Sequence, residues 1–264
     1  MIAVADNLNT RNKDYMAAVE ARDSKTLSGL AKALSDAGAD VINIQCSLDG
    51  SGDEDRLPWV LETVQGATDR VLCIDSRNIE AVKKALTLIK KPPLINYVSE
   101  TEPAQRQDCF SLANRAKAYI VLRAARGGNI PTSFENKLQI LETLLEDANR
   151  ADIPNERLFL DPSLIHIGRG AGQDHIMNTH ECILAIKEMV EPPVNTISWI
   201  SNVSTGMSPR QARKMTEAGI LTYLAGAGLD AALLDILDPA IRQSLYLIKS
   251  FRDEIVFSPA DLLA

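Results

Sequence analysis

Polar side chains able to form directional hydrogen bonds stand where short apolar runs of this chain stop. The segments Cys-Ile-Asp-Ser, Leu-Ile-Asn and Phe-Leu-Asp-Pro end three such runs at Asp75, Asn96 and Asp161. A fourth run is followed by Ser-Asn-Val-Ser, which contains Asn202, and the first run is followed by Asp6–Asn9. Asp, Asn and Ser also cap helices and form Asx turns, so a structural role is the simpler explanation for any single position. Five such ends, with two carboxylates and at least three carboxamides, are harder to explain by capping alone.

These residue types favour a neutral heterocycle rich in N–H groups as the ligand. No lysine stands at the strand ends and no glycine-rich loop precedes a helix, so a phosphate is disfavoured. His166, His175 and His180 lack metal-ligand spacing, so we expect surface or capping roles for them and no bound metal. A pterin fits better, because one carboxylate can accept both hydrogens of its amidine-like edge, N3–H and the 2-amino group. Carboxamides can then match the mixed donors and acceptors of the ring.

The elements that must position these residues are short β-branched runs that alternate with segments of helical periodicity. Glu135–Ala151 is one such segment and places Leu138, Leu141 and Leu145 on one face. The runs are Ile2–Ala5, Asp40–Ile44, Val71–Ile74, Pro93–Asn96, Ala118–Leu122, Arg157–Leu160, Asn195–Trp199 and roughly Asp230–Leu234. Strict alternation predicts parallel strands joined by helices. The eight units and the length of 264 residues predict a (β/α)₈ barrel, formed by a single domain over residues 1–264.

In such a barrel the carboxyl ends of the strands meet at one end, which carries the active site. We therefore expect the polar strand ends to converge on one pocket. The least regular stretches, Asp49–Asp55, Arg123–Thr132 and His166–Asp174, also follow strands and belong to the same rim. An open doubly wound sheet is the competing architecture, but no GxGxxG follows the first strand.

Composition and charge exclude several classes of partner. The net charge of −7 argues against nucleic acid and anionic membranes, which favour a basic face. No apolar run is long enough to span a bilayer and no signal peptide opens the chain, so we expect a cytoplasmic protein. Cys46 and Cys73 lie in or beside apolar runs, where we expect small buried hydrophobic residues.

Several of these segments, taken together and in order, resemble the pterin-binding methyltransferases over nearly the whole chain, from about Ile2 to Pro259. The most similar group is the methyltetrahydrofolate:corrinoid/iron–sulfur protein methyltransferases, with the tetrahydrofolate methyltransferases of corrinoid-dependent demethylases. The segments are Ile74-Asp75-Ser76, Ile95-Asn96, Asp161-Pro162, Gln173-Asp174-His175, Ser201-Asn202-Val203-Ser204 and Gly228-Leu229-Asp230-Ala231-Ala232.

The resemblance implies a role for each matching residue. Asp161 matches the carboxylate that holds N3–H and the 2-amino group, whereas Asp75 and Asn96 match the residues at the other pterin edge. Asn202 matches the asparagine that reaches N5, the atom that carries the methyl group, and is the implied catalytic residue. Further residues implied to bind the pterin are Asn9, Gln173 and Ser204.

The resemblance also implies the reaction and its partners. A methyl group moves between N5 of tetrahydrofolate, or its 5-methyl form, and the cobalt of a corrinoid. The chain has no DxHxxG loop to ligate a corrinoid, so the corrinoid arrives on a separate protein in a transient complex. Enzymes of this family are commonly homodimers, and we expect one here.

Three departures from the family bear on the reaction. Relatives have Glu-Arg-Ile-Asn after the first strand and Asp-x-Asn in the second, where this chain has Asp6–Asn9 and Asn43-Ile44-Gln45. The segment Arg123–Gly128 is also unlike the similar methyltransferases. These departures favour transfer from a methylcorrinoid to tetrahydrofolate, as in O-demethylation. The alternatives are a dihydropteroate synthase-like enzyme, whose Asn-x-Thr-x-Asp-Ser-Phe loop and late Lys-x-Arg are missing, and a non-catalytic folate-binding subunit of a methyltransferase complex.

Overall fold

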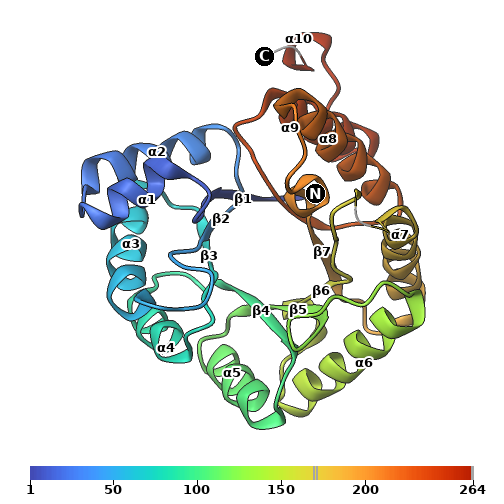
Figure 1. Ribbon diagram of the computed structural model, residues 1–264, viewed down its shortest axis with the longest axis horizontal. Coiled ribbons are helices and arrows are strands. Elements are labelled where there is room, and N and C mark those ends of the chain that lie inside the picture. Colours follow the sequence, from blue (N-terminus) through green and yellow to red (C-terminus); the bar gives the residue numbers. More distant parts are fainter. Residues whose placement is uncertain (169, 171, 263–264) are drawn as a thin grey trace.

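The computed structural model describes residues 1–168, 170 and 172–262, and its strands form a closed parallel barrel (Figure 1). Residues 169 and 171, within the expected rim segment His166–Asp174, lie outside the described residues. Each strand pairs with its neighbours in the sequence, and β1 closes the barrel against β8. The strands are β1 Ile2–Leu8, β2 Val41–Ile44, β3 Val71–Ile74, β4 Leu94–Glu100, β5 Tyr119–Arg126, β6 Leu158–Asp161, β7 Asn195–Trp199 and β8 Ala231–Leu234. The predicted (β/α)₈ fold is confirmed.

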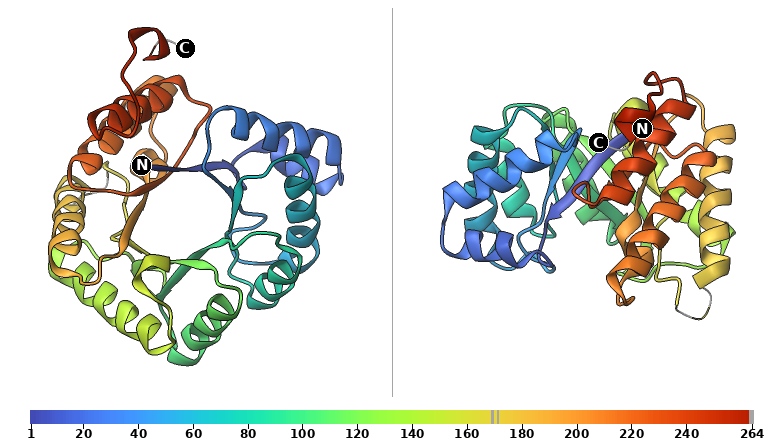
Figure 2. Two further views of the ribbon diagram at one scale, coloured as in Figure 1. Left: turned by 180° about the vertical axis from the view of Figure 1, so that it is seen from behind. Right: turned by 90° about the horizontal axis from the view of Figure 1, so that it is seen from above.

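Helices surround the barrel, and a short C-terminal helix projects from the ring beside α9 (Figures 1 and 2). The helices are α1 Lys13–Glu20, α2 Ser24–Asp36, α3 Asp53–Ala67, α4 Ile79–Leu88, α5 Pro103–Arg115, α6 Phe134–Arg150, α7 Gly172–Met189, α8 Arg210–Gly226, α9 Pro239–Phe251 and α10 Pro259–Leu262. Two 3₁₀ turns are η1 Asn155–Arg157 and η2 Ile200–Ser204. Among these helices, none is both long enough and apolar enough to cross a membrane.

Two separate apolar cores hold the fold together. The outer core lies between the strands and the helices, where residues such as Leu27, Leu61 and Leu144 are fully buried. Each such side chain contributes roughly 1.5–3 kcal/mol by leaving water. The inner core consists of strand residues alone, namely Val4, Cys73, Leu94, Val121, Phe159, Ile197, Ala231 and Leu233. These residues fill the barrel interior, so the barrel is closed below its polar end. Cys46 and Cys73 are buried, as predicted.

Two strands extend further toward this polar end than their apolar runs indicate. β1 continues beyond the predicted Ala5 to Leu8, with an irregularity in its pairing to β2 between these two residues. β5 continues beyond Leu122, because Val98 and Glu100 of β4 pair with Leu122 and Arg126. The prediction that Arg123 belongs to a loop was therefore wrong. Its inward-facing polar side chain interrupts the apolar pattern, but backbone pairing with β4 and β6 keeps it in the strand.

Helix capping accounts for some polar residues of the rim but not for those singled out above. The side chains of Asn12, Asn78 and Asp238 accept hydrogen bonds from backbone N–H groups in the first turns of α1, α4 and α9. None of Asp75, Asn96 and Asp161 caps a helix in this way. The expectation that capping alone does not explain the strand ends therefore agrees with the structure.

Candidate active site

Alternation along the strands directs a layer of polar side chains into the end of the barrel. Side chains of a strand point to opposite faces in turn, so the next inward position lies two residues beyond each member of the inner core. In β1, β3 and β6 this step leads from Val4 to Asp6, from Cys73 to Asp75 and from Phe159 to Asp161. In β1 to β7 the layer comprises Asp6, Asn43, Asp75, Asn96, Arg123, Asp161 and Trp199.

Hydrogen bonds join β1, β2 and β3 on one side of this layer. Asn43 Nδ2 donates to Asp6 Oδ1 at 3.1 Å and to Asp75 Oδ2 at 3.3 Å. Gln45 Nε2 donates to the same oxygen of Asp75 at 2.9 Å. On the solvent side, Arg11 pairs with Asp6 at 2.9 Å. Both carboxyl groups are thus held in fixed orientations before any ligand binds.

The two neighbouring carboxyl groups have perturbed acidities. Burial, and then the nearby Asp6 carboxylate, raise the pKa of Asp75 to about 7, against the opposing effect of the hydrogen bonds from Asn43 and Gln45. Burial also raises the pKa of Asp6, although Arg11 opposes this shift. A carboxyl group that titrates near neutrality can hold or release a proton at little cost.

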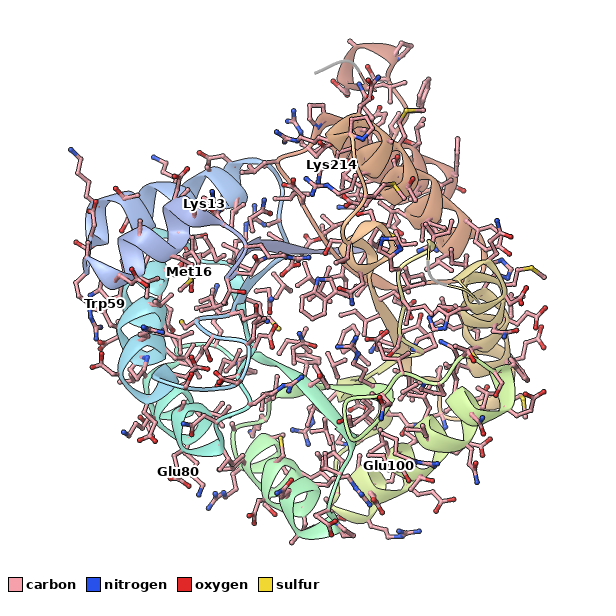
Figure 3. The ribbon with its side chains drawn as sticks, in the orientation of Figure 1. Lys13, Met16, Trp59, Glu80, Glu100 and Lys214 are labelled. Carbon is pink, nitrogen blue, oxygen red and sulfur yellow. The ribbon has the colours of Figure 1, made fainter. Side chains whose placement is uncertain are left out.

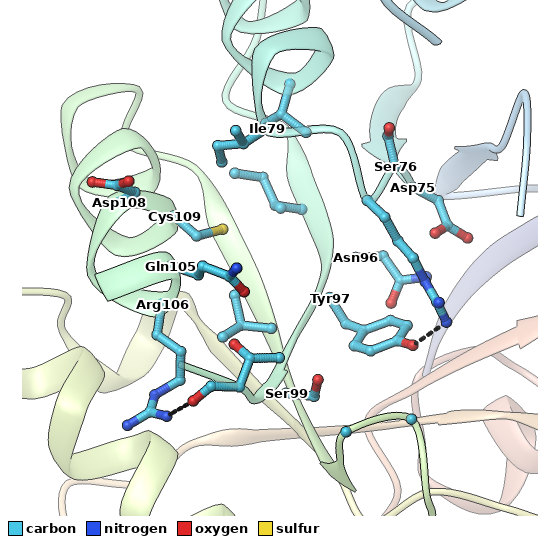
Figure 4. Close-up of a pocket in the computed structure, with 17 residues that line it drawn as sticks. Asp75, Ser76, Ile79, Asn96, Tyr97, Ser99, Gln105, Arg106, Asp108 and Cys109 are labelled. Carbon is cyan, nitrogen blue, oxygen red and sulfur yellow. Dashed lines mark hydrogen bonds between the residues drawn. The ribbon is translucent and has the colours of Figure 1, made fainter. Parts of the chain in front are cut away.

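Asn96 presents an unused donor beside Asp75. Its Nδ2 atom is buried and has no hydrogen-bond acceptor among the described residues. Buried polar groups are nearly always paired, so this amide is suited to a ligand acceptor. Asp75, Asn96 and Tyr97 lie on one side of a cavity of about 470 Å³, whose other walls come mainly from α4, α5 and the outer part of β4 (Figure 4). Arg77, which also lines it, donates to the Tyr97 hydroxyl at 3.3 Å. The size and the mixed lining suit a small heterocycle.

Arg123 joins the remaining strands on the other side of the layer. Its Nε lies 3.5 Å from Asp161 Oδ2 and donates to Ser163 Oγ at 3.2 Å. Its guanidinium carbon lies 4.6 Å from the centre of the Tyr97 ring and 5.7 Å from that of the Trp199 ring. Both distances are within the range of cation–π attraction. Trp199 also donates through Nε1 to Asp6 Oδ2 at 2.5 Å, so it connects the two sides of the layer.

Asp161 keeps capacity for a ligand despite these contacts. Burial raises its pKa, and Arg123 opposes the shift. Its Oδ1 atom accepts the backbone N–H of Ser163 at 2.8 Å. A carboxylate can accept about four hydrogen bonds, so two N–H groups of a ligand can still be accommodated. Of the three strand-end residues Asp75, Asn96 and Asp161, the first two line the 470 Å³ cavity and Asp161 does not.

A buried lysine anchors the segment that follows Asp161. Lys137 of α6 is inaccessible to solvent, and its Nζ donates to the backbone carbonyls of Pro162 and Ser163 and, at 3.1 Å, to Thr179 Oγ1. Burial lowers its pKa to about 8. The expected surface or capping role of His175 was wrong, because His175 is buried next to Lys137 and accepts the backbone N–H of Ile165 at 2.9 Å.

Asn202 lies in η2, directly after β7, and its side chain is half-buried. It makes no side-chain hydrogen bond to any residue that the structure describes, so both its donor and its acceptor remain available. It does not cap the following helix, since α8 begins at Arg210 after Pro209. Its neighbour Ser201 donates to Asp6 Oδ2 at 3.4 Å, which places η2 beside the polar layer.

The other three residues expected at the pterin have different surroundings. Asn9 forms a local turn, in which its Oδ1 accepts the Arg11 N–H at 2.9 Å and its Nδ2 donates to the Asp6 carbonyl at 2.5 Å. Ser204 is fully buried and donates to Glu217 of α8. Gln173 is exposed in the first turn of α7. The structure thus brings Asp75 and Asn96 together in one cavity, and Asn9 and Ser204 line a different one. Asp161, Gln173 and Asn202 line neither of these two cavities.

Inference from the sequence missed part of this layer. Asp6, Asn43, Gln45, Arg123 and Trp199 were not among the expected site residues. A signal was present, because each lies an even number of positions beyond an inward apolar residue of its own strand. Four of them, all but Trp199, also fall in segments that differ from the resembled methyltransferases. In the part of the chain that the structure describes, no group of three or more His, Cys, Asp or Glu side chains could hold a metal ion.

Comparison with known proteins identifies the family. The family description "Pterin binding enzyme" matches residues 7–235, which include every residue of the polar layer except Asp6. The chain belongs to the pterin-binding enzymes. One curated relative of this pterin-binding chain is the methylcorrinoid:tetrahydrofolate methyltransferase of Eubacterium limosum. It is 27% identical over an alignment of 240 residues, which covers 89% of this chain and 85% of the relative.

Solved structures of other pterin-binding enzymes share the fold. The dihydropteroate synthase of Yersinia pestis with a pterin–sulfa conjugate superposes with a TM-score of 0.70 at 15% identity, over 96% of this chain and 94% of that one. The enzyme of Thermus thermophilus gives a TM-score of 0.68 at 18% identity, over 94% of both chains. At these identities the likeness shows the barrel fold alone.

Proposed function

We propose that this pterin-binding enzyme transfers a methyl group from the cobalt of a methylcorrinoid, carried by a separate protein, to N5 of tetrahydrofolate. The curated methylcorrinoid:tetrahydrofolate methyltransferase supports this reaction through its 27% identity over most of both chains. Methyl transfer breaks the cobalt–carbon bond, whose electron pair stays on cobalt, and forms a carbon–nitrogen bond at N5. N5 then carries positive charge until its proton is lost.

The observation that carries the proposal is the free carboxamide of Asn202 at the edge of a buried, prearranged polar layer. An amide offers a donor and an acceptor, so a rotation or small swing of this side chain can serve both the neutral and the charged N5. Groups prearranged around an atom whose charge changes contribute strongly to catalysis. We assign no general acid or base, and the N5 proton passes to solvent or through the ring's hydrogen-bond network.

The pterin ring lies in this proposal across the polar layer. Asp161 accepts N3–H and the 2-amino group, while Asp75 and Asn96 hold the opposite edge. Asn9 contributes through its hydrogen bonds within the turn after β1, which keep that turn next to the ligand. Ser204 contributes through its hydrogen bond to Glu217, which holds the η2 turn in place. Gln173 contacts the substrate only at the rim, where its side chain is exposed.

The corrinoid is a substrate presented by its own protein, so the barrel end must remain accessible. The complex is transient, because the corrinoid protein also has to accept its methyl group elsewhere. We propose in addition that the chain forms a homodimer. Light scattering should then give twice the 28.8 kDa of one chain at micromolar concentration, and a single-chain mass contradicts the dimer.

The direct test is turnover with methylcob(III)alamin and tetrahydrofolate. We expect loss of the methylcobalamin absorbance and formation of 5-methyltetrahydrofolate, detected by mass spectrometry. Condensation of a pterin pyrophosphate with p-aminobenzoate, without methyl transfer, identifies a dihydropteroate synthase-like enzyme instead. Folate binding with neither reaction identifies a non-catalytic folate-binding subunit.

A further inference from the structure

A second cavity, of about 600 Å³, lies beside the polar layer, and Asp6 of that layer is among its lining residues. It is formed by the turn after β1, the start of α1, η2 and the first turns of α8. Figure 3 labels Lys13 and Lys214, two of its lining residues, on helices in adjacent sectors of the ring. The cavity therefore opens between the N-terminal and the C-terminal parts of the barrel wall.

The cations that line this cavity are not all neutralised by the protein. Arg11 pairs with Asp6 at 2.9 Å, and Lys214 lies between Glu217 at 3.0 Å and Asp235 at 2.8 Å. For Lys13, Arg210 and Arg213, by contrast, the described residues provide no carboxylate within 4.0 Å. The carboxylates on the lining are Asp6, Asp14, Glu217 and Asp235, so the five cations leave one excess positive charge there. In a chain with a net charge of −7, a cavity with a positive excess and unpaired cations favours an anionic ligand.

Arg213 gives the strongest local evidence. Its Nε atom is buried and has no acceptor among the residues that the structure describes. Leaving a charged donor without a partner is costly, and guanidinium groups match carboxylates well because they present parallel N–H groups. The arginine is therefore prepared to receive an acceptor that the protein does not supply.

With N5 placed at Asn202, as proposed above, the tail of a folate leaves the ring beside this cavity. In folates, C6 carries the aminobenzoyl-glutamate tail and is bonded directly to N5. Residues on both sides of Asn202 in the sequence, Ser201 and Ser204, line this cavity. If Asn202 reaches N5, as proposed above, the tail extends from the ring along η2 toward Arg210 and Arg213.

We propose that this cavity binds the carboxylates of the glutamate tail and selects folates with several γ-linked glutamates. This inference rests on the proposed function, because it uses the position of N5 at Asn202. Each added glutamate brings one more carboxylate, so the three unpaired cations can bind a polyglutamyl tail more strongly than a single glutamate. Raised salt weakens this contribution, since part of the cavity is open to solvent.

The test compares dissociation constants for three probes: a tetrahydropterin without a tail, tetrahydrofolate with one glutamate, and tetrahydrofolate with three. For the natural chain we expect the triglutamate to bind at least about tenfold more tightly than the monoglutamate. In the double variant Arg210→Gln, Arg213→Gln this ratio should fall to about one, while the affinity for the tailless pterin is unchanged. Arg115→Gln, at an exposed arginine that ends α5, is the matched control and should keep the full ratio.

The outcomes separate this inference from the proposed function. Equal affinity of the natural chain for both folates, or a preference that survives in the double variant, overturns the tail site and leaves the pterin assignment standing. Failure of the natural chain to bind even the tailless pterin overturns the pterin assignment itself. Folate affinities that are unchanged in the double variant, with methyl transfer from a corrinoid protein lost, assign these cations to the protein partner instead.

Discussion

Arg123 and Asp161 are paired residues of β5 and β6, and their side chains form a buried ion pair with 3.5 Å between Nε and Oδ2. The arginine thus compensates the one carboxylate that is proposed to bind the amidine edge of the pterin. It contacts the Tyr97 and Trp199 rings as well, so a single side chain links four strands of the barrel end.

Loss of Arg123 should make pterin binding dependent on pH. In Arg123→Met the Asp161 carboxylate loses its opposing charge, so the pKa of Asp161 rises further and less of the ionised form is present at neutrality. We expect tetrahydrofolate affinity to fall by about tenfold at pH 7 and to recover partly at pH 9. Titration calorimetry at both pH values measures this. Arg126→Met removes an exposed arginine of the same strand and should have little effect. An equal loss at both pH values contradicts the electrostatic role.

Asp161→Asn keeps the shape of the side chain but removes its charge and one acceptor. Binding of tetrahydrofolate should weaken by roughly 1.5–3 kcal/mol, the value of a charge-assisted hydrogen bond. The dissociation constant is to be measured together with the circular dichroism spectrum and thermal midpoint, which show whether the variant is folded. A folded variant with the natural affinity refutes the assignment of Asp161.

Asn202→Ala should affect the rate more than the binding. Methyl transfer in a single turnover should fall by roughly 10²–10³, the range seen when one prearranged donor is removed. The folate dissociation constant should change much less, because the interaction is strongest when N5 is charged. Asn195→Ala, at the opposite end of β7, controls for general effects of truncating an asparagine. Equal losses in rate and affinity make Asn202 a binding residue only, and no loss in either makes it a structural turn residue.

Asp75 should reduce the stability of the free protein at neutral and alkaline pH. Its pKa is about 7 in the folded state and higher than in the unfolded chain, so the folded state retains a proton that the unfolded state has released. The contribution of Asp75 to the free energy of unfolding is fully present below the pKa that it has in the unfolded chain. This contribution is lost as the pH rises through the folded pKa of about 7. Asp75→Asn should therefore be more stable than the natural chain at pH 8, by on the order of 2–4 kcal/mol, with the difference shrinking toward pH 4.

Urea unfolding at several pH values measures this difference. Asp69→Asn, at an exposed aspartate before β3, is the control and should show a much smaller dependence. A constant difference between Asp75→Asn and the natural chain across the pH range contradicts the raised pKa. Retention of a destabilising carboxyl group fits a residue kept for binding rather than for folding.

The order of elements and the barrel were determined by the sequence alone, because hydrophobic periodicity and strict alternation are local properties. The same holds for Asp75, Asn96 and Asp161, since each stands where an apolar run stops. Parallel strands bring their carboxyl ends together in any barrel, so their convergence on one end followed from the topology without knowledge of side-chain contacts.

Only the tertiary structure decided how the polar layer is connected and which cavity each residue faces. Arg123 was expected to follow the fifth strand, in the irregular stretch Arg123–Thr132, yet pairing between β4 and β5 keeps it in the strand, where it reaches Asp161. The partners of Asn9, Ser204 and Lys137 lie on other segments of the chain or in a specific turn. The raised pKa of Asp75 likewise depends on its burial beside Asp6. Burial, electrostatic coupling and long-range pairing depend on distances between residues far apart in the sequence, and these distances exist only once the barrel has closed.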